Sequence, residues 1–75
     1  MKTIEIRLTT LEDVRNFVNI VTRYDIDVDL SSGRYVVDAK SIMGIFSLDL
    51  LSPIKLTAYS ENPDKLFDEL KPYII

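Results

Sequence analysis

Few side chains in this 75-residue sequence could take part in covalent or acid–base chemistry. The chain has no histidine and no cysteine. Histidine is the commonest general base and metal ligand, and a cysteine thiolate is a common nucleophile. Serine–histidine and cysteine–histidine pairs are therefore excluded, and we expect no enzyme activity. A Gly-rich phosphate loop is also excluded, because Gly33 and Gly44 are the only glycines.

The remaining titratable cluster is a group of aspartates. Asp25, Asp27 and Asp29 follow each other closely, and the last two share one face of a predicted strand. Three carboxylates could bind a hard cation such as calcium or magnesium. An Asp-rich calcium loop, however, needs a glycine and a closing glutamate at fixed positions, and Gly33 comes too late. We therefore predict a solvated surface here, with no metal and no cofactor.

The most informative hydroxyl group lies in the segment KSIMGIFSLDL, residues 40–50. Ser41 comes directly before an apolar run and can cap a helix by accepting a backbone N–H. On that helix Ile45 and Leu48 would face the core, with Leu50 beside them. Three further apolar side chains lie at or beyond the edge of that face: Ile42, Met43 and Phe46. They either fold over the domain's own core or form a docking patch, because apolar groups near water mark partner surfaces.

Composition limits the class of protein. Hydrophobic residues make up 47% and charged residues 28% of the chain, values typical of a folded single domain over residues 1–75. Twelve acidic against nine basic residues give a net charge of −3, which argues against nucleic acid as a partner. No apolar run is long enough to cross a membrane, and the first residues alternate without a signal-peptide block. With no disulfide framework, we expect a cytoplasmic protein.

Hydrophobic periodicity predicts seven elements in the order β-α-β-β-α-β-α. Alternation predicts strands over residues 2–8, 26–30, 35–39 and 54–59. A helix over residues 11–23 would bury a stripe formed by Leu11, Val14, Phe17, Val18 and Val21. A short helix follows Ser41 and stops before Ser52-Pro53, and a last helix ends at Pro72.

Turn and cap signals mark the element ends. Thr9 or Thr10 can cap the first helix, and Thr9 with Glu12 has the spacing of a capping box. Residues 31–34 predict a hairpin loop, in which Gly33 can adopt a positive φ. Asn62 is predicted as the cap of the last helix, with proline at its first position.

These elements predict an α+β fold, with a four-stranded, mainly antiparallel sheet and three helices on one face. The other face would be open to water. It would display a solvated set of polar side chains: Glu5, Arg7, Asp27, Asp29, Asp38, Lys55 and Tyr59.

Two stretches of the chain resemble the HPr family, the phosphocarrier proteins of the bacterial sugar phosphotransferase system. Residues 40–48, KSIMGIFSL, are similar to the regulatory serine segment of that family. Residues 24–30, YDIDVDL, are similar to its strand after the first helix and align with no gap. The resemblance covers a little over half of the chain. It implies an HPr-like open-faced β-sandwich, in agreement with the element order.

The resemblance also shows what is missing. HPr proteins carry an active histidine in a Gly-x-His-Ala-Arg-Pro phrase, which the alignment places over residues 9–13. The histidine falls on Thr10, the arginine on Glu12 and the proline on Asp13. A phosphoryl group there would face two carboxylates in place of positive charge. The chain would thus be a divergent member without phosphocarrier activity, similar in that respect to Crh.

Ser41 has a second interpretation that comes from the resemblance. In HPr proteins of some bacteria the matching serine is phosphorylated by HPr kinase, and the product binds a transcriptional regulator. The same resemblance places Ile42, Met43 and Phe46 in the docking patch for these partners and for enzyme I, which ranks last here. A phosphate on Ser41 would lie beside Lys40. Against this, Glu12 replaces the family's arginine.

We therefore predict a regulatory or protein-binding module related to the phosphotransferase system and modified at Ser41. The alternative is a structural or homodimeric module, unrelated to sugar transport, that uses the apolar patch around Ile42, Met43 and Phe46. Ser41 would then be a helix cap only.

Overall fold

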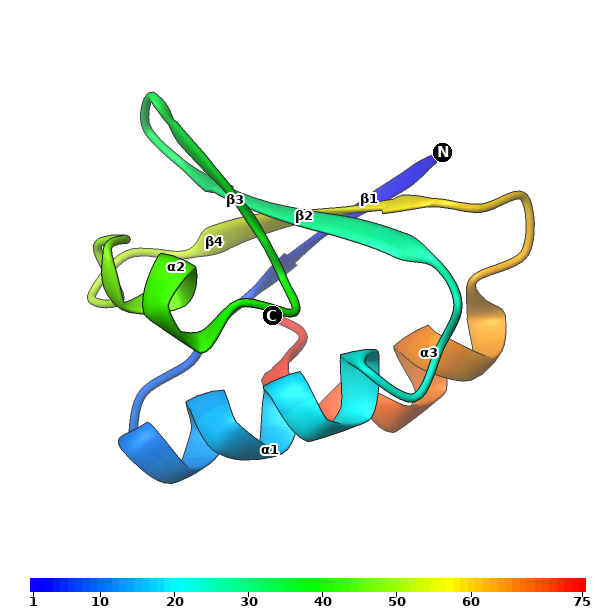
Figure 1. Ribbon diagram of the computed structural model, residues 1–75, viewed down its shortest axis with the longest axis horizontal. Coiled ribbons are helices and arrows are strands. Elements are labelled where there is room, and N and C mark those ends of the chain that lie inside the picture. Colours follow the sequence, from blue (N-terminus) through cyan, green and yellow to red (C-terminus); the bar gives the residue numbers. More distant parts are fainter.

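Four strands form one antiparallel sheet in the order β1-β4-β2-β3 in the computed structural model, which describes residues 1–75. The strands are β1 (Lys2–Ile6), β2 (Asp27–Ser32), β3 (Tyr35–Asp38) and β4 (Ile54–Tyr59). All helices lie on one side of this sheet (Figure 1): α1 (Leu11–Val21), α2 (Ile42–Phe46), α3 (Asp64–Glu69) and the 3-10 turn η1 (Lys71–Tyr73). The predicted α+β class, element order and open-faced β-sandwich are confirmed.

The core lies between the sheet and the helices. Alternation along β4 buries Ile54, Leu56 and Ala58 and leaves Lys55 and Tyr59 exposed. Sixteen apolar side chains join in one buried cluster, and no buried side-chain polar atom lacks a hydrogen-bond partner. This single, close-packed core holds α1 and α2 in fixed positions against the sheet.

Hydrogen bonds outside the regular elements mark two boundaries that differ from the predicted ones. β1 ends at Ile6, two residues early, because the Arg7 N–H donates to the Tyr73 carbonyl (2.8 Å) at the C-terminus. The first helix ends at Val21 instead of residue 23, where the bonding pattern changes: the Arg23 and Tyr24 N–H groups donate to carbonyls three residues back, Ile20 and Val21 (3.2 Å each). The C-terminal residues therefore take over the edge of β1 where the strand was expected to continue.

Leu11 was expected in the buried stripe of α1, and this expectation is wrong. Its side chain is 59% exposed, whereas Val14, Phe17 and Val21 are fully buried. Leu11 is the first residue of α1, so it lies beyond the part of the helix that covers the sheet.

The hairpin between β2 and β3 is tighter than predicted. β2 continues to Ser32, and only Gly33 and Arg34 form the turn. Gly33 has a φ of 59°, the value that a type II′ turn needs at its first central position. This turn fixes the register of β3 against β2.

The start of α3 also differs by one residue. Pro63, and not Asn62, is the cap residue of this helix. The Asn62 side chain still accepts the Asp64 N–H, at 3.4 Å.

Candidate functional site

Ser41 lies at the N-terminus of α2 with an extended backbone (φ −104°, ψ 106°), as a cap residue requires. Its Oγ accepts the Gly44 N–H at 3.0 Å, and its carbonyl accepts the Ile45 N–H at 3.0 Å. At the other end, the Ser47 hydroxyl donates to the Gly44 carbonyl at 2.6 Å. The helix is thus a short segment held by a serine at each end, and it ends at Phe46, well short of Ser52-Pro53, which the prediction gave as its limit.

Gly44 permits a close approach between α2 and the sheet. A Cβ atom at this position would lie 3.1 Å from Val37 Cβ and 3.2 Å from Ser41 Oγ. Because Gly44 has no side chain, α2 packs closely against β3, and the Ser41 hydroxyl reaches the Gly44 N–H.

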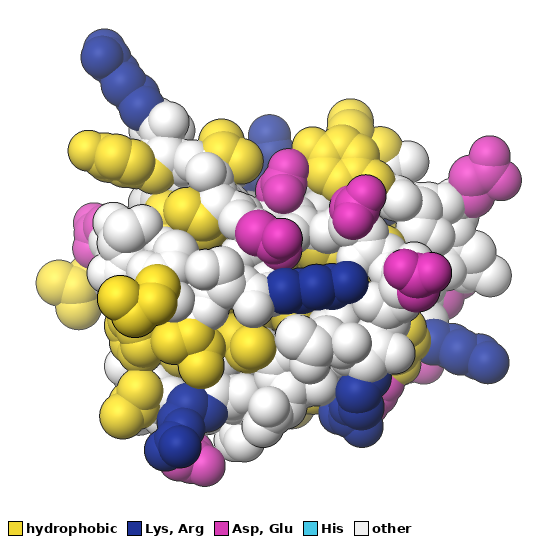
Figure 2. Space-filling view, in the orientation of Figure 1, with side chains coloured by type: hydrophobic (Ala, Val, Ile, Leu, Met, Phe, Trp, Pro, Cys, Tyr) yellow, Lys and Arg dark blue, Asp and Glu magenta, His cyan; other side chains and the backbone are white.

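The apolar side chains of α2 divide as the sequence predicted. Ile45 is fully buried and Leu48 nearly so, whereas Ile42, Met43 and Phe46 are 37%, 80% and 44% exposed. Figure 2 shows hydrophobic side chains gathered over α2 and the adjoining end of α1. We call Ile42, Met43 and Phe46 the α2 patch.

Two further exposed leucines lie in segments next to α2, one in α1 and one in the loop after α2. Leu11 begins α1, which contacts α2, and Leu51 follows α2 and is 92% exposed. Sequence reasoning missed both as surface residues. For Leu51 a signal was present, because Asp49 before it is a turn residue: its carboxylate accepts the Leu51 N–H (3.0 Å) and the Ser52 hydroxyl (3.0 Å).

Lys40 does not point to the cap of α2 as expected. Its Nζ donates to the Tyr24 carbonyl at 2.9 Å, at the C-terminal end of α1. Tyr24 lies in the turn that follows α1. The amine is therefore bound by this turn and is not free beside Ser41.

Thr10 caps α1 through a capping box that lies one residue later than predicted. The Thr10 Oγ1 accepts the Asp13 N–H at 3.0 Å. In return, Asp13 Oδ2 accepts the N–H groups of Thr9 (3.1 Å) and Thr10 (3.2 Å). Glu12 makes no such bond and is exposed. The N–H donors ahead of α1 are thus already bound by a carboxylate of the same helix.

The C-terminal residues border the start of α1. Ile6 pairs with Ile74, and the Ile75 N–H donates to the Glu5 carbonyl at 3.1 Å. A shallow hollow of about 500 Å³ lies between Arg7, Thr9 and Asp13 on one side and the C-terminal residues 72–75 on the other. No histidine or cysteine lies in it.

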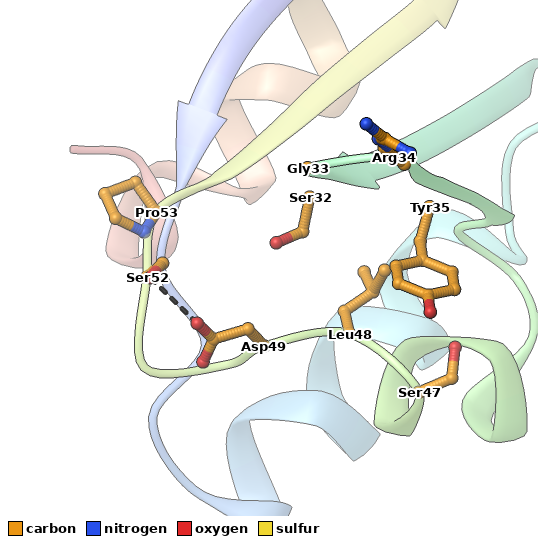
Figure 3. A pocket seen from close by; sticks show the side chains of 9 residues that line it. All are labelled: Ser32, Gly33, Arg34, Tyr35, Ser47, Leu48, Asp49, Ser52 and Pro53. Atoms are coloured by element: carbon orange, nitrogen blue, oxygen red, sulfur yellow. Dashed lines mark hydrogen bonds between the residues drawn. The ribbon is translucent and has the colours of Figure 1, made fainter.

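A second hollow, of about 710 Å³, lies between the β2–β3 turn and the loop after α2. Figure 3 shows Tyr35 beside Leu48 on one side and the hydrogen-bonded pair Asp49 and Ser52 on the other. Since both oxygens of Asp49 accept bonds from its own loop, this carboxylate shapes the loop.

The open face of the sheet carries the predicted polar side chains except Arg7, which follows the end of β1 and lies in the hollow beside Thr9 and Asp13. Asp29 and Asp38 lie directly opposite each other on β2 and β3. Asp29 also raises the pKa of Tyr59, because its negative charge disfavours the phenolate. No group of three acidic side chains comes together closely enough to hold a metal ion. None of the helices has the length and apolar character needed to cross a membrane.

The fold and its sites define a small open-faced β-sandwich that presents exposed apolar side chains on α2. The family model described as "PTS HPr component phosphorylation site" matches residues 13–74, so the chain belongs to the HPr family of the phosphotransferase system. The match begins at Asp13, the last residue of the altered phrase, and leaves Thr10 and Glu12 outside it. A comparison with curated protein sequences finds no significant match.

Two solved structures support the same conclusion about the fold. HPr-C-His from Thermoanaerobacter tengcongensis is 25% identical with a TM-score of 0.79, over 96% of this chain and 89% of that one. The phosphocarrier protein HPr from Bacillus anthracis str. Ames is 23% identical with a TM-score of 0.76, over 99% and 96% of the two chains. The predicted family is confirmed.

Proposed function

We propose that this member of the HPr family does not carry phosphoryl groups and acts as a regulatory, protein-binding module related to the phosphotransferase system. The observation that carries this proposal is the absence of histidine from the whole chain. A phosphocarrier of this family needs an imidazole, and we assign Thr10 to its position.

The geometry around Thr10 supports the loss of the carrier function. The N–H groups of Thr9 and Thr10 are bound by Asp13, and Glu12 adds a second negative charge in the same turn. A phosphoryl group would have to displace one carboxylate and approach another, and the cation in this hollow, Arg7, shares it with Asp13. The N-terminal turn of α1 therefore serves to stabilise the helix.

The α2 patch supports a binding role. Met43 and Phe46 together expose an adaptable thioether and a large ring, side chains that are common in docking surfaces. By analogy with the family, we propose HPr kinase and a transcriptional regulator as partners, with enzyme I ranked below them. Ser41, at the edge of this patch, is the proposed phosphorylation site. Its Oγ accepts one hydrogen bond, and its O–H donates none, so the hydroxyl is available to receive a phosphoryl group.

Phosphoryl transfer tests the first half of the proposal. Incubation with phosphoenolpyruvate and enzyme I should leave the protein unlabelled. Thr10→His should also stay unlabelled, because Asp13 still occupies the N–H donors, whereas Thr10→His with Glu12→Arg and Asp13→Pro should gain acid-labile phosphate. Such a phosphate on the unchanged protein would overturn the proposal.

Incubation with HPr kinase and ATP tests the second half. One phosphate should be added, and Ser41→Ala should abolish it. Ser47→Ala is the matched control, because it removes a hydroxyl from the other end of α2 and should leave labelling intact. Glu12→Arg should increase the labelling or the binding that follows it. If the kinase labels neither the unchanged protein nor Glu12→Arg, Ser41 is a helix cap only.

A further inference from the structure

The two edges of the sheet differ in how they are covered. On the β1 edge, the C-terminal residues pair with Ile6 and bond to Glu5. On the other edge, β3 has β2 on one side and no strand on the other. The turn end of the β2–β3 hairpin stands clear of the helices in Figure 1. An uncovered edge strand is a template for pairing with another chain.

The hydrogen-bond phase shows which groups of β3 face outward. The Ala39 N–H donates to the Val28 carbonyl at 2.9 Å, and Val37 lies opposite Leu30. Because bonded and non-bonded pairs alternate in an antiparallel ladder, the backbone N–H and C=O of Val36 point away from β2. The Val36 side chain is 65% exposed. The centre of the edge therefore offers both a free backbone pair and an apolar side chain.

We infer that β3 pairs with β3 of a second copy of this chain, antiparallel and related by a two-fold axis at Val36. In this register Val36 lies opposite Val36, Tyr35 opposite Val37, and Arg34 opposite Asp38 of the second copy. Tyr35 is 66% exposed in the single chain and gains a β-branched neighbour. Aromatic–β-branched and opposite-charge cross-strand pairs both stabilise a sheet.

Charge complementarity selects a second copy as the occupant. The structure contains three ion pairs, and Arg34 takes part in none of them. Asp29 and Asp38 face each other directly, and like charges directly opposite disfavour a sheet; the Asp38 carboxylate accepts only the Lys40 backbone N–H (2.8 Å) and has no cation. The two-fold pairing brings one Arg34 to each such aspartate pair.

Neighbouring registers are worse. A two-fold axis at Val37 would place Arg34 opposite Lys40 and Val36 opposite Asp38 of the second copy. The ladder is also limited in length, because the Asp38 carbonyl already accepts the Ser41 N–H (3.0 Å) where the chain turns into α2. Residues 34–38 are therefore the whole contact strand. This contact uses the sheet edge and is independent of the proposed function of the α2 patch.

Sedimentation equilibrium on the full chain tests the charge pairing. The protein should form a dimer whose dissociation constant rises at least about tenfold in Arg34→Glu, because two ion pairs become like-charge contacts. Lys55→Glu is the matched control, since it makes the same change of charge on β4 in the interior of the same sheet face. The double variant Arg34→Glu with Asp38→Arg should restore the dimer.

Single cysteines test the register without relying on the charge variants, because the chain has no cysteine of its own. Directly opposed, hydrogen-bonded residues have Cα atoms about 5.5 Å apart, a distance that a disulfide spans. Val36→Cys should therefore cross-link rapidly on oxidation, and Lys55→Cys should not. A monomer at all concentrations, equal cross-linking of both variants, or a dimer lost in Phe46→Ser but kept in Arg34→Glu would overturn the inference.

Discussion

The N-termini of α1 and α2 both begin at a hydroxyl residue, Thr10 and Ser41, yet they differ in charge and in surroundings. The first turn of α1 contains Glu12 and Asp13, and the N–H groups ahead of it are bound by Asp13. The first turn of α2 contains no acidic residue, and exposed apolar side chains follow its cap. Both helices thus begin with a hydroxyl cap, but the cap of α1 is followed by acidic residues and the cap of α2 by exposed apolar residues.

This difference indicates how the fold can lose one activity and keep a binding surface. Negative charge at the start of α1 stabilises that helix, by about 0.3–1 kcal/mol per carboxylate, and repels a phosphoryl group. Nothing comparable stabilises α2, which depends on the buried Ile45 and on its two serines. We therefore expect changes at α1 to act on stability and changes at α2 to act on binding.

The largest effect is expected for Phe46→Ser. Affinity for HPr kinase should fall at least about tenfold if Phe46 is an anchor of the α2 patch. The free energy of unfolding should fall by about 1 kcal/mol or less, because the ring is already 44% exposed. Binding by surface-immobilised kinase and urea denaturation measure the two quantities.

Tyr59→Ser is the control for Phe46→Ser, because Tyr59 is a similarly exposed ring on the opposite face of the molecule. It should leave the affinity unchanged. A loss of about 3–5 kcal/mol in Phe46→Ser would instead assign this ring to the core.

The next largest effect is expected for Asp13→Ala. It removes the acceptor for the N–H groups of Thr9 and Thr10, so the free energy of unfolding should fall by about 1–2 kcal/mol. Glu12→Ala removes a charge but no hydrogen bond and should cost less. Urea denaturation checks both values. If Asp13→Ala lowered the affinity for the kinase as much as Phe46→Ser does, the start of α1 would contribute to binding and not only to stability.

A smaller effect is expected for Ser41→Ala. Loss of the bond to the Gly44 N–H should cost about 1 kcal/mol, whereas Ser41→Asp keeps a good cap and should cost nearly nothing. Thermal unfolding of the two variants gives the comparison. Equal destabilisation by both changes would show that the cap is not what Ser41 contributes to stability.

The smallest effect concerns the far end of α1. The Tyr24 hydroxyl donates to Glu69, and this hydrogen bond, together with desolvation and the negative charge of Glu69, raises the pKa of Tyr24. Since the folded state favours the protonated phenol, this contribution to stability is present below pH about 10 and is lost as pH rises through the raised pKa.

Glu69→Gln should lower the pKa of Tyr24 towards its ordinary value. An ultraviolet titration of the phenols measures it, with Tyr24→Phe to assign the signal. An unchanged pKa of Tyr24 in Glu69→Gln would mean that the hydrogen bond to Glu69 does not stabilise the turn after α1.

The parts of the site that could be predicted are those formed by residues close together in the sequence. The spacing on α2 separated buried Ile45 from exposed Met43 and Phe46, since both faces follow from one helical period. The capping box was placed one residue early, because Thr9–Glu12 and Thr10–Asp13 have the same spacing. Only the structure chooses between them: Thr10 has the extended backbone of a cap residue directly before Leu11, and its hydroxyl accepts the Asp13 N–H.

The sequence by itself determined the element order and the absence of an imidazole, because periodicity and residue identity are local properties. Only the tertiary structure decided that Lys40 binds the Tyr24 carbonyl and that the Tyr24 hydroxyl reaches Glu69, 45 residues away. It also decided that β3 is an uncovered edge whose Asp38 faces Asp29. Such contacts depend on the order of strands in the sheet, and that order results from packing the whole core at once.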